Sequence, residues 1–143
     1  HLFEAFQIEC HERGVAVQHI LYDIDDCESL ARYLPSNLFR DAAMQLIFVL
    51  GRYSGQGASG AHDLDPFLEW LRSKEITPDW SVCAFGKAEA AALIYASQRG
   101  GKCRIGFENS LYLPNGRLAR DNAEKVSAFV AERTKALHQK EAR

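Results

Sequence analysis

Regular alternation between strand-like and helix-like periods constrains the fold of this chain more than any other sequence feature. Apolar runs typical of buried strands occur at residues 15–22, 44–50, 80–85 and 102–107. Each run is followed by a segment whose apolar residues recur at helical spacing, and another helical pattern precedes the first run. Strands that alternate with helices of this length favour right-handed crossovers and a parallel sheet. We therefore predict an α/β fold built from four strand–helix units.

Length and continuity predict a single domain over residues 1–143, because no linker or low-complexity segment interrupts the chain. Two architectures fit the pattern. One is a small doubly wound sheet, and the other is half of a (β/α)8 barrel of the TIM type, which needs roughly 250 residues when complete. Both are built from the same units, so the pattern alone does not decide between them. The chain begins at His1, inside a helical pattern, and this suggests a piece of something longer.

Composition argues against several classes of function. The formal net charge of −2 offers no clustered basic surface for a nucleic acid. No apolar run approaches the roughly 18 residues that a membrane span needs, so no membrane partner is expected. The four cysteines form no CxxC pair, which argues against a zinc knuckle. Cysteines inside apolar strand-like runs suit a reducing compartment, and we expect a cytoplasmic protein.

A glycine-rich loop at residues 51–60 follows the second strand-like run. Gly55 to Gly60 match the GxGxxG pattern of dinucleotide-binding proteins. The strand ends near Leu50 and the next helix begins near Asp65, however, and a dinucleotide fingerprint would join the two directly. A flexible active-site loop whose backbone amides face an anion is the favoured interpretation, and a plain surface loop stays open. The candidate cofactor-binding residues are Gly51, Ser54 and Gly55.

The fourth strand-like run carries the most informative side chains. Alternation along a strand at 102–107 would put Arg104, Gly106 and Glu108 on one face. Charges on a central parallel strand are costly to bury, so this arrangement suggests a ligand cavity. The guanidinium of Arg can donate two parallel hydrogen bonds to a carboxylate, and Glu can bind a metal ion. A structural Arg–Glu ion pair is an equally open interpretation of these residues alone.

The segment that begins at Arg104 also carries a family resemblance. Residues 104–119, RIGFENSLYLPNGRLA, resemble the signature RVGLEDNLYLPDGRLA of the β-keto acid cleavage enzymes. The segment 48–51, FVLG, is similar to a strand end of that family, and Trp80-Ser81-Val82 is similar to its WSV segment. The resemblance extends through most of the chain.

The resemblance implies a (β/α)8 barrel, of which this chain would supply roughly strands five to eight. It implies a catalytic zinc bound by two histidines and one glutamate, and the glutamate corresponds to Glu108. The family's catalytic arginine corresponds to Arg104, and its partner aspartate corresponds to Asn109. Arg104 and Asn109 are thus the candidate catalytic residues, and Glu108 is the candidate metal ligand. The histidines belong to an early strand that lies outside this sequence.

The implied reaction exchanges acyl groups between a small-molecule β-keto acid and acetyl-CoA, which is the co-substrate. The products are acetoacetate and a new acyl-CoA. A non-catalytic or binding domain derived from the same family is the alternative, and a dinucleotide oxidoreductase is a distant third. If the chain forms a barrel arc, its four strands should lie in sequential order. An arc leaves two open edges, so a homo-oligomer or a larger protein is expected.

Overall fold

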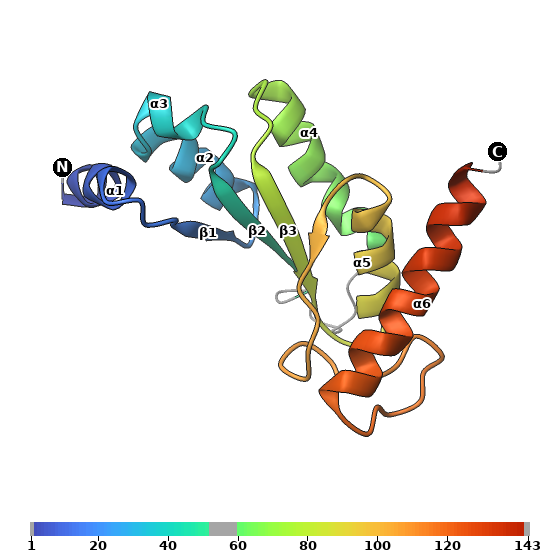
Figure 1. Cartoon of the computed structure of the whole chain (residues 1–143). Coiled ribbons are helices and arrows are strands. Elements are labelled where there is room, and N and C mark those ends of the chain that lie inside the picture. Colours follow the sequence, from blue (N-terminus) through green and yellow to red (C-terminus); the bar gives the residue numbers. More distant parts are fainter. Residues whose placement is uncertain (1, 52–59, 142–143) are drawn as a thin grey trace. The chain divides into compact units, whose positions relative to one another are not determined.

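The computed structural model describes residues 2–51 and 60–141, and its elements alternate between helices and strands as expected. In chain order they are α1 (Leu2–Glu12), β1 (Gln18–Leu21), α2 (Ile24–Tyr33), α3 (Ser36–Phe39), β2 (Gln45–Leu50), the 3-10 helix η1 (Ala61–Leu64), α4 (Asp65–Ser73), β3 (Asp79–Ala84), α5 (Glu89–Ser97), β4 (Lys102–Cys103) and α6 (Asn122–Glu141) (Figure 1). Within the described residues, no helix combines the length and apolarity that crossing a membrane requires.

The strands form one parallel sheet in the order β1-β2-β3-β4. Gln18 of β1 lies opposite Gln45 of β2, and Ser81 of β3 lies opposite Lys102 of β4. The sequential order confirms the prediction, because a doubly wound sheet would place the first strand inside the sheet rather than at its edge. The buried run of β2 explains its central position: five of its six residues are buried, as expected for a parallel strand covered on both faces.

The chain forms two compact units. Unit 1 comprises the chain up to Phe48 together with Asp65–Trp80, and unit 2 comprises Val49–Leu64 together with the chain from Ser81 onward. Aromatic rings fill the core of unit 1. The ring centroid of Phe48 lies 4.7 Å from that of Phe67 and 5.9 Å from that of Trp80. These rings join β2, α4 and the start of β3 into one core.

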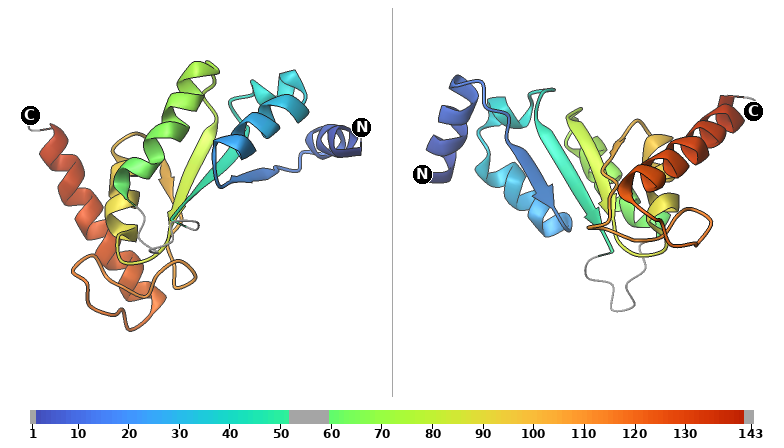
Figure 2. Two further views of the ribbon diagram at one scale, coloured as in Figure 1. Left: turned by 180° about the vertical axis from the view of Figure 1, so that it is seen from behind. Right: turned by 60° about the horizontal axis from the view of Figure 1, so that its bottom comes forward.

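Helix α5 organises unit 2. On one side it contacts η1, where the Tyr95 hydroxyl lies 3.3 Å from His62 Nδ1. On another side it packs against α6 (Figure 2). Just after α5, Gln98 Nε2 donates a hydrogen bond to the carbonyl of Ala136. The inner face of α5 carries small and branched residues that are fully buried: Ala92, Leu93 and Ala96. Small residues allow this helix to approach its neighbours closely.

Strand β4 is shorter than the sequence predicts. The apolar pattern indicated a strand over residues 102–107, whereas β4 ends at Cys103. The Arg104 amide still donates to the Val82 carbonyl at 2.9 Å, but the chain then turns, since the amides of Asn109 and Ser110 both donate to the Gly106 carbonyl. The two-residue alternation of side chains therefore stops at Arg104. The prediction that Arg104, Gly106 and Glu108 share one strand face was wrong.

The aromatic core of unit 1 makes a testable prediction about stability. Phe48→Ala should lower the free energy of unfolding of the 143-residue chain by about 3–5 kcal/mol, because the truncation leaves a cavity between Phe67 and Trp80. Urea denaturation followed by circular dichroism measures this change. Phe6→Ala is the matched control: the Phe6 ring is largely exposed, so its loss should change the same free energy by less than about 0.5 kcal/mol. Equal effects of the two variants would contradict the assignment of the core.

Candidate functional site

Arg104 and Glu108, two of the residues singled out in the sequence, form an ion pair in unit 2. Arg104 follows β4 directly, and its Nη2 atom donates to Glu108 Oε2. Both side chains are accessible, with exposed fractions of 42% and 71%. The turn at Gly106, rather than strand alternation, brings them together. The segment therefore presents a positive and a negative group side by side at the carboxyl end of a parallel strand, where sites of α/β folds lie.

Asn109 is buried beside this pair and links two loops. Its Nδ2 atom donates to the Arg104 carbonyl at 3.1 Å, and its own carbonyl accepts the Gly86 amide at 3.2 Å. Gly86 lies in the loop after β3 and adopts a positive φ of 83°, which favours glycine. Asn109 thus fixes the backbone of Arg104 against the neighbouring loop. Its Oδ1 atom accepts no hydrogen bond from the residues that the structure describes.

A buried ion pair that the sequence analysis missed lies behind the same segment. Lys125 comes from α6 and Glu89 from the start of α5, and their side chains are 1% and 3% exposed. Lys125 Nζ donates to Glu89 Oε2 and to the carbonyl of Ser110, and it lies 3.5 Å from the carbonyl of Tyr112. Lys125 lies one helical turn before the buried Phe129. That spacing is the one sequence signal that it faces inward.

Burial dominates the electrostatics of this region. It raises the pKa of Glu89, while the Lys125 ammonium, the Asn109 carboxamide and the Gly106 amide oppose that rise by favouring the carboxylate. Burial also raises the pKa of the Cys83 thiol on β3, and the positive charge of Arg104 opposes this rise. A thiol with a raised pKa is a poor nucleophile at neutral pH. Cys83 is therefore a packing residue in this structure.

The start of α6 is fixed by reciprocal hydrogen bonds. Asp121 Oδ1 accepts the Glu124 amide, and Glu124 Oε2 accepts the Arg120 amide, each at 2.7 Å. This arrangement resembles a capping box, in which two side chains satisfy the first amides of a helix. The backbone amides that these carboxylates accept lower the pKa of both. Arg117 Nη2 also pairs with Glu124 Oε1 at 2.6 Å, so the cap joins the preceding loop to α6.

The structure reaches only part of the glycine-rich loop. Gly51 follows β2 and adopts a φ of 82°, a conformation that favours glycine. Ser54 and Gly55, the other two candidate cofactor-binding residues, lie outside the described residues, as does most of the GxGxxG pattern. The Gly60 amide donates to Asp63 Oδ2 at 2.8 Å. Helix α4 begins at Asp65, as the sequence predicted.

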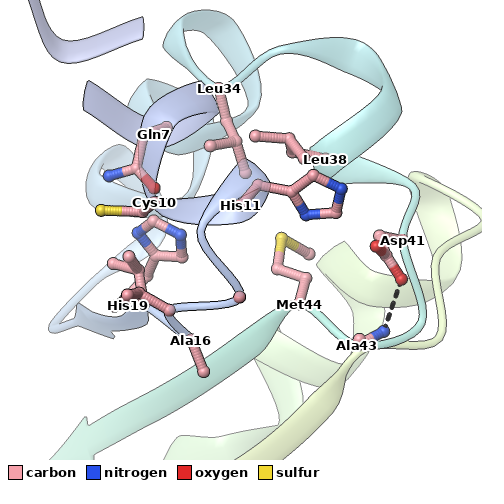
Figure 3. Close-up of a pocket in the computed structure, with 13 residues that line it drawn as sticks. Gln7, Cys10, His11, Ala16, His19, Leu34, Leu38, Asp41, Ala43 and Met44 are labelled. Atoms are coloured by element: carbon pink, nitrogen blue, oxygen red, sulfur yellow. Dashed lines mark hydrogen bonds between the residues drawn. The ribbon is translucent and has the colours of Figure 1, made fainter. Parts of the chain in front are cut away.

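Unit 1 contains a cavity of about 270 Å³ that involves none of the expected site residues. Figure 3 shows His11, His19 and Met44 among the side chains around it. Its walls include residues 14–17, which precede β1, and residues 43–44, which precede β2. The cavity therefore lies at the amino ends of these strands, opposite the edge where sites of parallel α/β folds occur. Burial lowers the pKa of His19, which favours a neutral imidazole in its wall.

The described residues do not make a zinc site by themselves. Among residues 2–51 and 60–141, no three or more His, Cys, Asp or Glu side chains gather in a way that would hold a metal ion. Glu108, the candidate ligand, is engaged with Arg104. A single carboxylate is too few ligands for zinc, which takes at least three from a protein. Any zinc bound through Glu108 requires further ligands from outside these residues.

A parallel sheet whose strands alternate with helices defines an α/β protein, and the accessible ion pair lies in the loop after its strand β4. Residues 2–140 match the family of the beta-keto acid cleavage enzyme, and the chain belongs to this family.

The chain is similar to two proteins with different names. The chain is 30% identical over 119 residues to a 3-keto-5-aminohexanoate cleavage enzyme of Fusobacterium nucleatum, in a match that covers 83% of the chain and 41% of the relative. It is 26% identical over 122 residues to a 3,5-dioxohexanoate:acetyl-CoA acetone transferase of Paraburkholderia graminis, covering 82% of the chain and 37% of the relative. The chain thus spans about two fifths of the length of these relatives.

The isolated position of Glu108 makes a prediction about metal content. We expect the 143-residue chain to retain well under one zinc ion per chain after dialysis against a mild chelator, because one carboxylate binds zinc weakly. Elemental analysis of the dialysed chain measures this ratio. A ratio near one would mean that residues other than Glu108 complete a site within the chain. In the complete protein, Glu108→Gln should lower the zinc content if Glu108 is a ligand.

The cap of α6 predicts a dependence of stability on pH. The pKa values of Asp121 and Glu124 are lowered from 3.8 and 4.5, so their contribution is present above those values and is lost as the pH falls through the lower folded values. Glu89 changes the stability in the opposite direction as the pH falls, because its pKa is raised in the folded chain. Asp121→Asn keeps a good cap without the charge, so the variant should lose less stability on acidification than the wild type. Thermal melts between pH 2 and pH 7 measure the difference, and parallel curves would refute the assignment.

Proposed function

We propose that the complete protein catalyses an acyl-transferring cleavage of a β-keto acid with acetyl-CoA. The observation that carries this proposal is the accessible Arg104–Glu108 pair after β4, in a chain of the β-keto acid cleavage enzyme family. Acetyl-CoA as co-substrate is supported by the name of the acetone transferase relative.

The reaction balances as an exchange of two acyl groups. The bond between the α- and β-carbons of the β-keto acid breaks, and the α-carbon, which keeps its carboxylate, joins the acetyl carbon of acetyl-CoA to give acetoacetate. The bond between the acetyl carbonyl carbon and the sulfur of CoA breaks in that step, and the freed thiolate takes the remaining acyl group as a new thioester. Negative charge develops on the carbonyl oxygens during these steps, and a preorganised cation nearby lowers the barrier.

We assign to Arg104 the role of stabilising this developing negative charge. Its guanidinium offers several donors in a fixed plane, which suits a carboxylate or an oxyanion, and its backbone is held by Val82 and Asn109. Asn109 has no acidic proton to exchange, so we assign it the role of fixing Arg104 through a neutral hydrogen bond. We assign Glu108 the role of one ligand of a zinc ion whose other ligands lie outside this chain.

The glycine-rich loop is the proposed site for the co-substrate. Gly51 follows the carboxyl end of β2, Arg104 follows the carboxyl end of β4, and both residues belong to unit 2. Backbone amides of a glycine-rich loop bind anions such as the phosphates of CoA. We therefore propose that Gly51, Ser54 and Gly55 contact acetyl-CoA.

We further propose that the chain supplies four consecutive strand–helix units of a (β/α)8 barrel and acts as a single domain within it. The sequential strand order supports this proposal, and so does the edge position of β1. Ile20 on β1 and Phe6 on α1 are both exposed in unit 1, as are other apolar residues of α1. Such surfaces favour association with further chain segments or with another copy, which supports the expectation of a homo-oligomer.

Substitution of Arg104 tests the proposed function. Arg104→Ala should lower the rate of acetyl-CoA consumption by the complete protein by roughly 100-fold or more, because it removes the cation that stabilises developing charge. Release of acetoacetate, measured over a panel of β-keto acids, gives the rate. Arg13→Ala is a matched control, since Arg13 also pairs with a carboxylate four residues away on an exposed surface. It should leave the rate unchanged.

Two results would contradict this assignment. Equal rates for Arg104→Ala and the wild type would remove Arg104 from the reaction. Absence of acyl transfer by the wild-type protein across the whole panel would instead favour a non-catalytic or binding domain derived from the family.

A further inference from the structure

The buried pair of Glu89 and Lys125 has no part in the function proposed above, and its burial is costly. Two charges lose their hydration when they are buried, and their mutual attraction often fails to offset that loss. Apolar side chains of similar volume would commonly stabilise the fold as well. The two side chains are only 1% and 3% exposed, so a contribution to stability alone does not explain why the interior contains two charges.

The polar contacts of the pair concentrate on the segment 104–112. The Lys125 ammonium donates to the carbonyl of Ser110 and lies within reach of that of Tyr112. Burial raises the pKa of Glu89, and Lys125, the Asn109 carboxamide and the Gly106 amide oppose that rise. The ammonium thus binds the segment just after its turn, at Ser110 and Tyr112.

Arg104 and Glu108 lie in this segment, and both side chains are accessible. Asn109 connects the two regions, because its Nδ2 atom donates to the Arg104 carbonyl while its side chain faces Glu89. Asn109 therefore lies between the ion pair of α5 and α6 and the backbone of Arg104.

We propose that Glu89 and Lys125 are positioning residues that hold the segment 104–112 in the conformation that presents Arg104 and Glu108. The catalytic part of this proposal rests on the proposed function, but the positioning itself is a property of the segment. Because the pair uses a full charge to bind two neutral carbonyls, it holds the turn more firmly than neutral side chains would.

Neutralising substitutions separate positioning from stability. Glu89→Gln and Lys125→Met each keep the side-chain volume, and each alone leaves one buried charge without its partner, which should lower the melting temperature. The double variant E89Q/K125M removes both charges and should melt near the wild-type temperature. Lys135→Met is the control, because Lys135 pairs with Glu132 on the exposed part of α6.

Amide hydrogen exchange of the complete protein gives the deciding measurement. In the double variant, the amides of segment 104–112 should lose protection by about 10-fold or more, because a hydrogen bond from a charged group to a carbonyl is lost. Protection in β3 and in the middle of α5 should stay unchanged, and Lys135→Met should match the wild type throughout. The value of kcat should fall by a similar factor in the double variant, with a smaller change in KM, because the cation is misplaced rather than removed.

A double variant that melts like the wild type and also keeps wild-type protection over 104–112 would overturn the positioning role. A uniform loss of protection over all of unit 2 would overturn it as well, since it would show a general structural effect. If the wild type proves inactive, the proposed function fails, while the exchange comparison still decides the positioning.

Should the variants fail to fold, the wild type alone provides a test. The amides of Phe107, Ser110 and Tyr112 should exchange as slowly as those at the start of α6, and far more slowly than the amide of Asn115 in the exposed turn 114–116. Exchange of the segment at the rate of that turn would overturn the proposal.

Discussion

The arrangement of unit 2 depends on the interactions of the Lys125 ammonium group. It joins α6 to α5 through Glu89 and joins both helices to the loop after β4 through the Ser110 carbonyl. Burial of a charge is tolerated only when its hydrogen bonds are satisfied, so the surrounding groups have little freedom to move. The loop that carries Arg104 therefore takes its shape from two helices that follow or precede it in sequence.

Most of the fold could be predicted from the periodicity of apolar residues in the sequence. The buried run at 45–50 and the segments at helical spacing placed the strands and helices within a few residues, because burial on a sheet or helix face imposes a regular pattern. The strand order also agreed with the family resemblance. The end of β4 did not follow from the pattern, since the amides of Asn109 and Ser110 both bond to the Gly106 carbonyl and this turn interrupts an apolar run.

The candidate site was predictable only in part. Arg104 and Glu108 were recognisable as charges in an apolar context, and the structure brings them together as an ion pair. Their geometry was mispredicted, because alternation holds only while the backbone stays extended. Glu89 and Lys125 escaped notice because each looks like an ordinary surface residue of an amphipathic helix. Only the packing of α5 against α6 places both in the interior.

The single ammonium behind Asn109 also constrains how this site can diverge between lineages. A lineage that exchanged Asn109 for Asp would set a second carboxylate beside Glu89, and one ammonium neutralises only one of the two. A single substitution at any of these positions changes the net charge of the buried cluster, and a second substitution is needed to restore it. The charges at positions 89, 109 and 125 are therefore coupled, although the three positions are far apart in the chain.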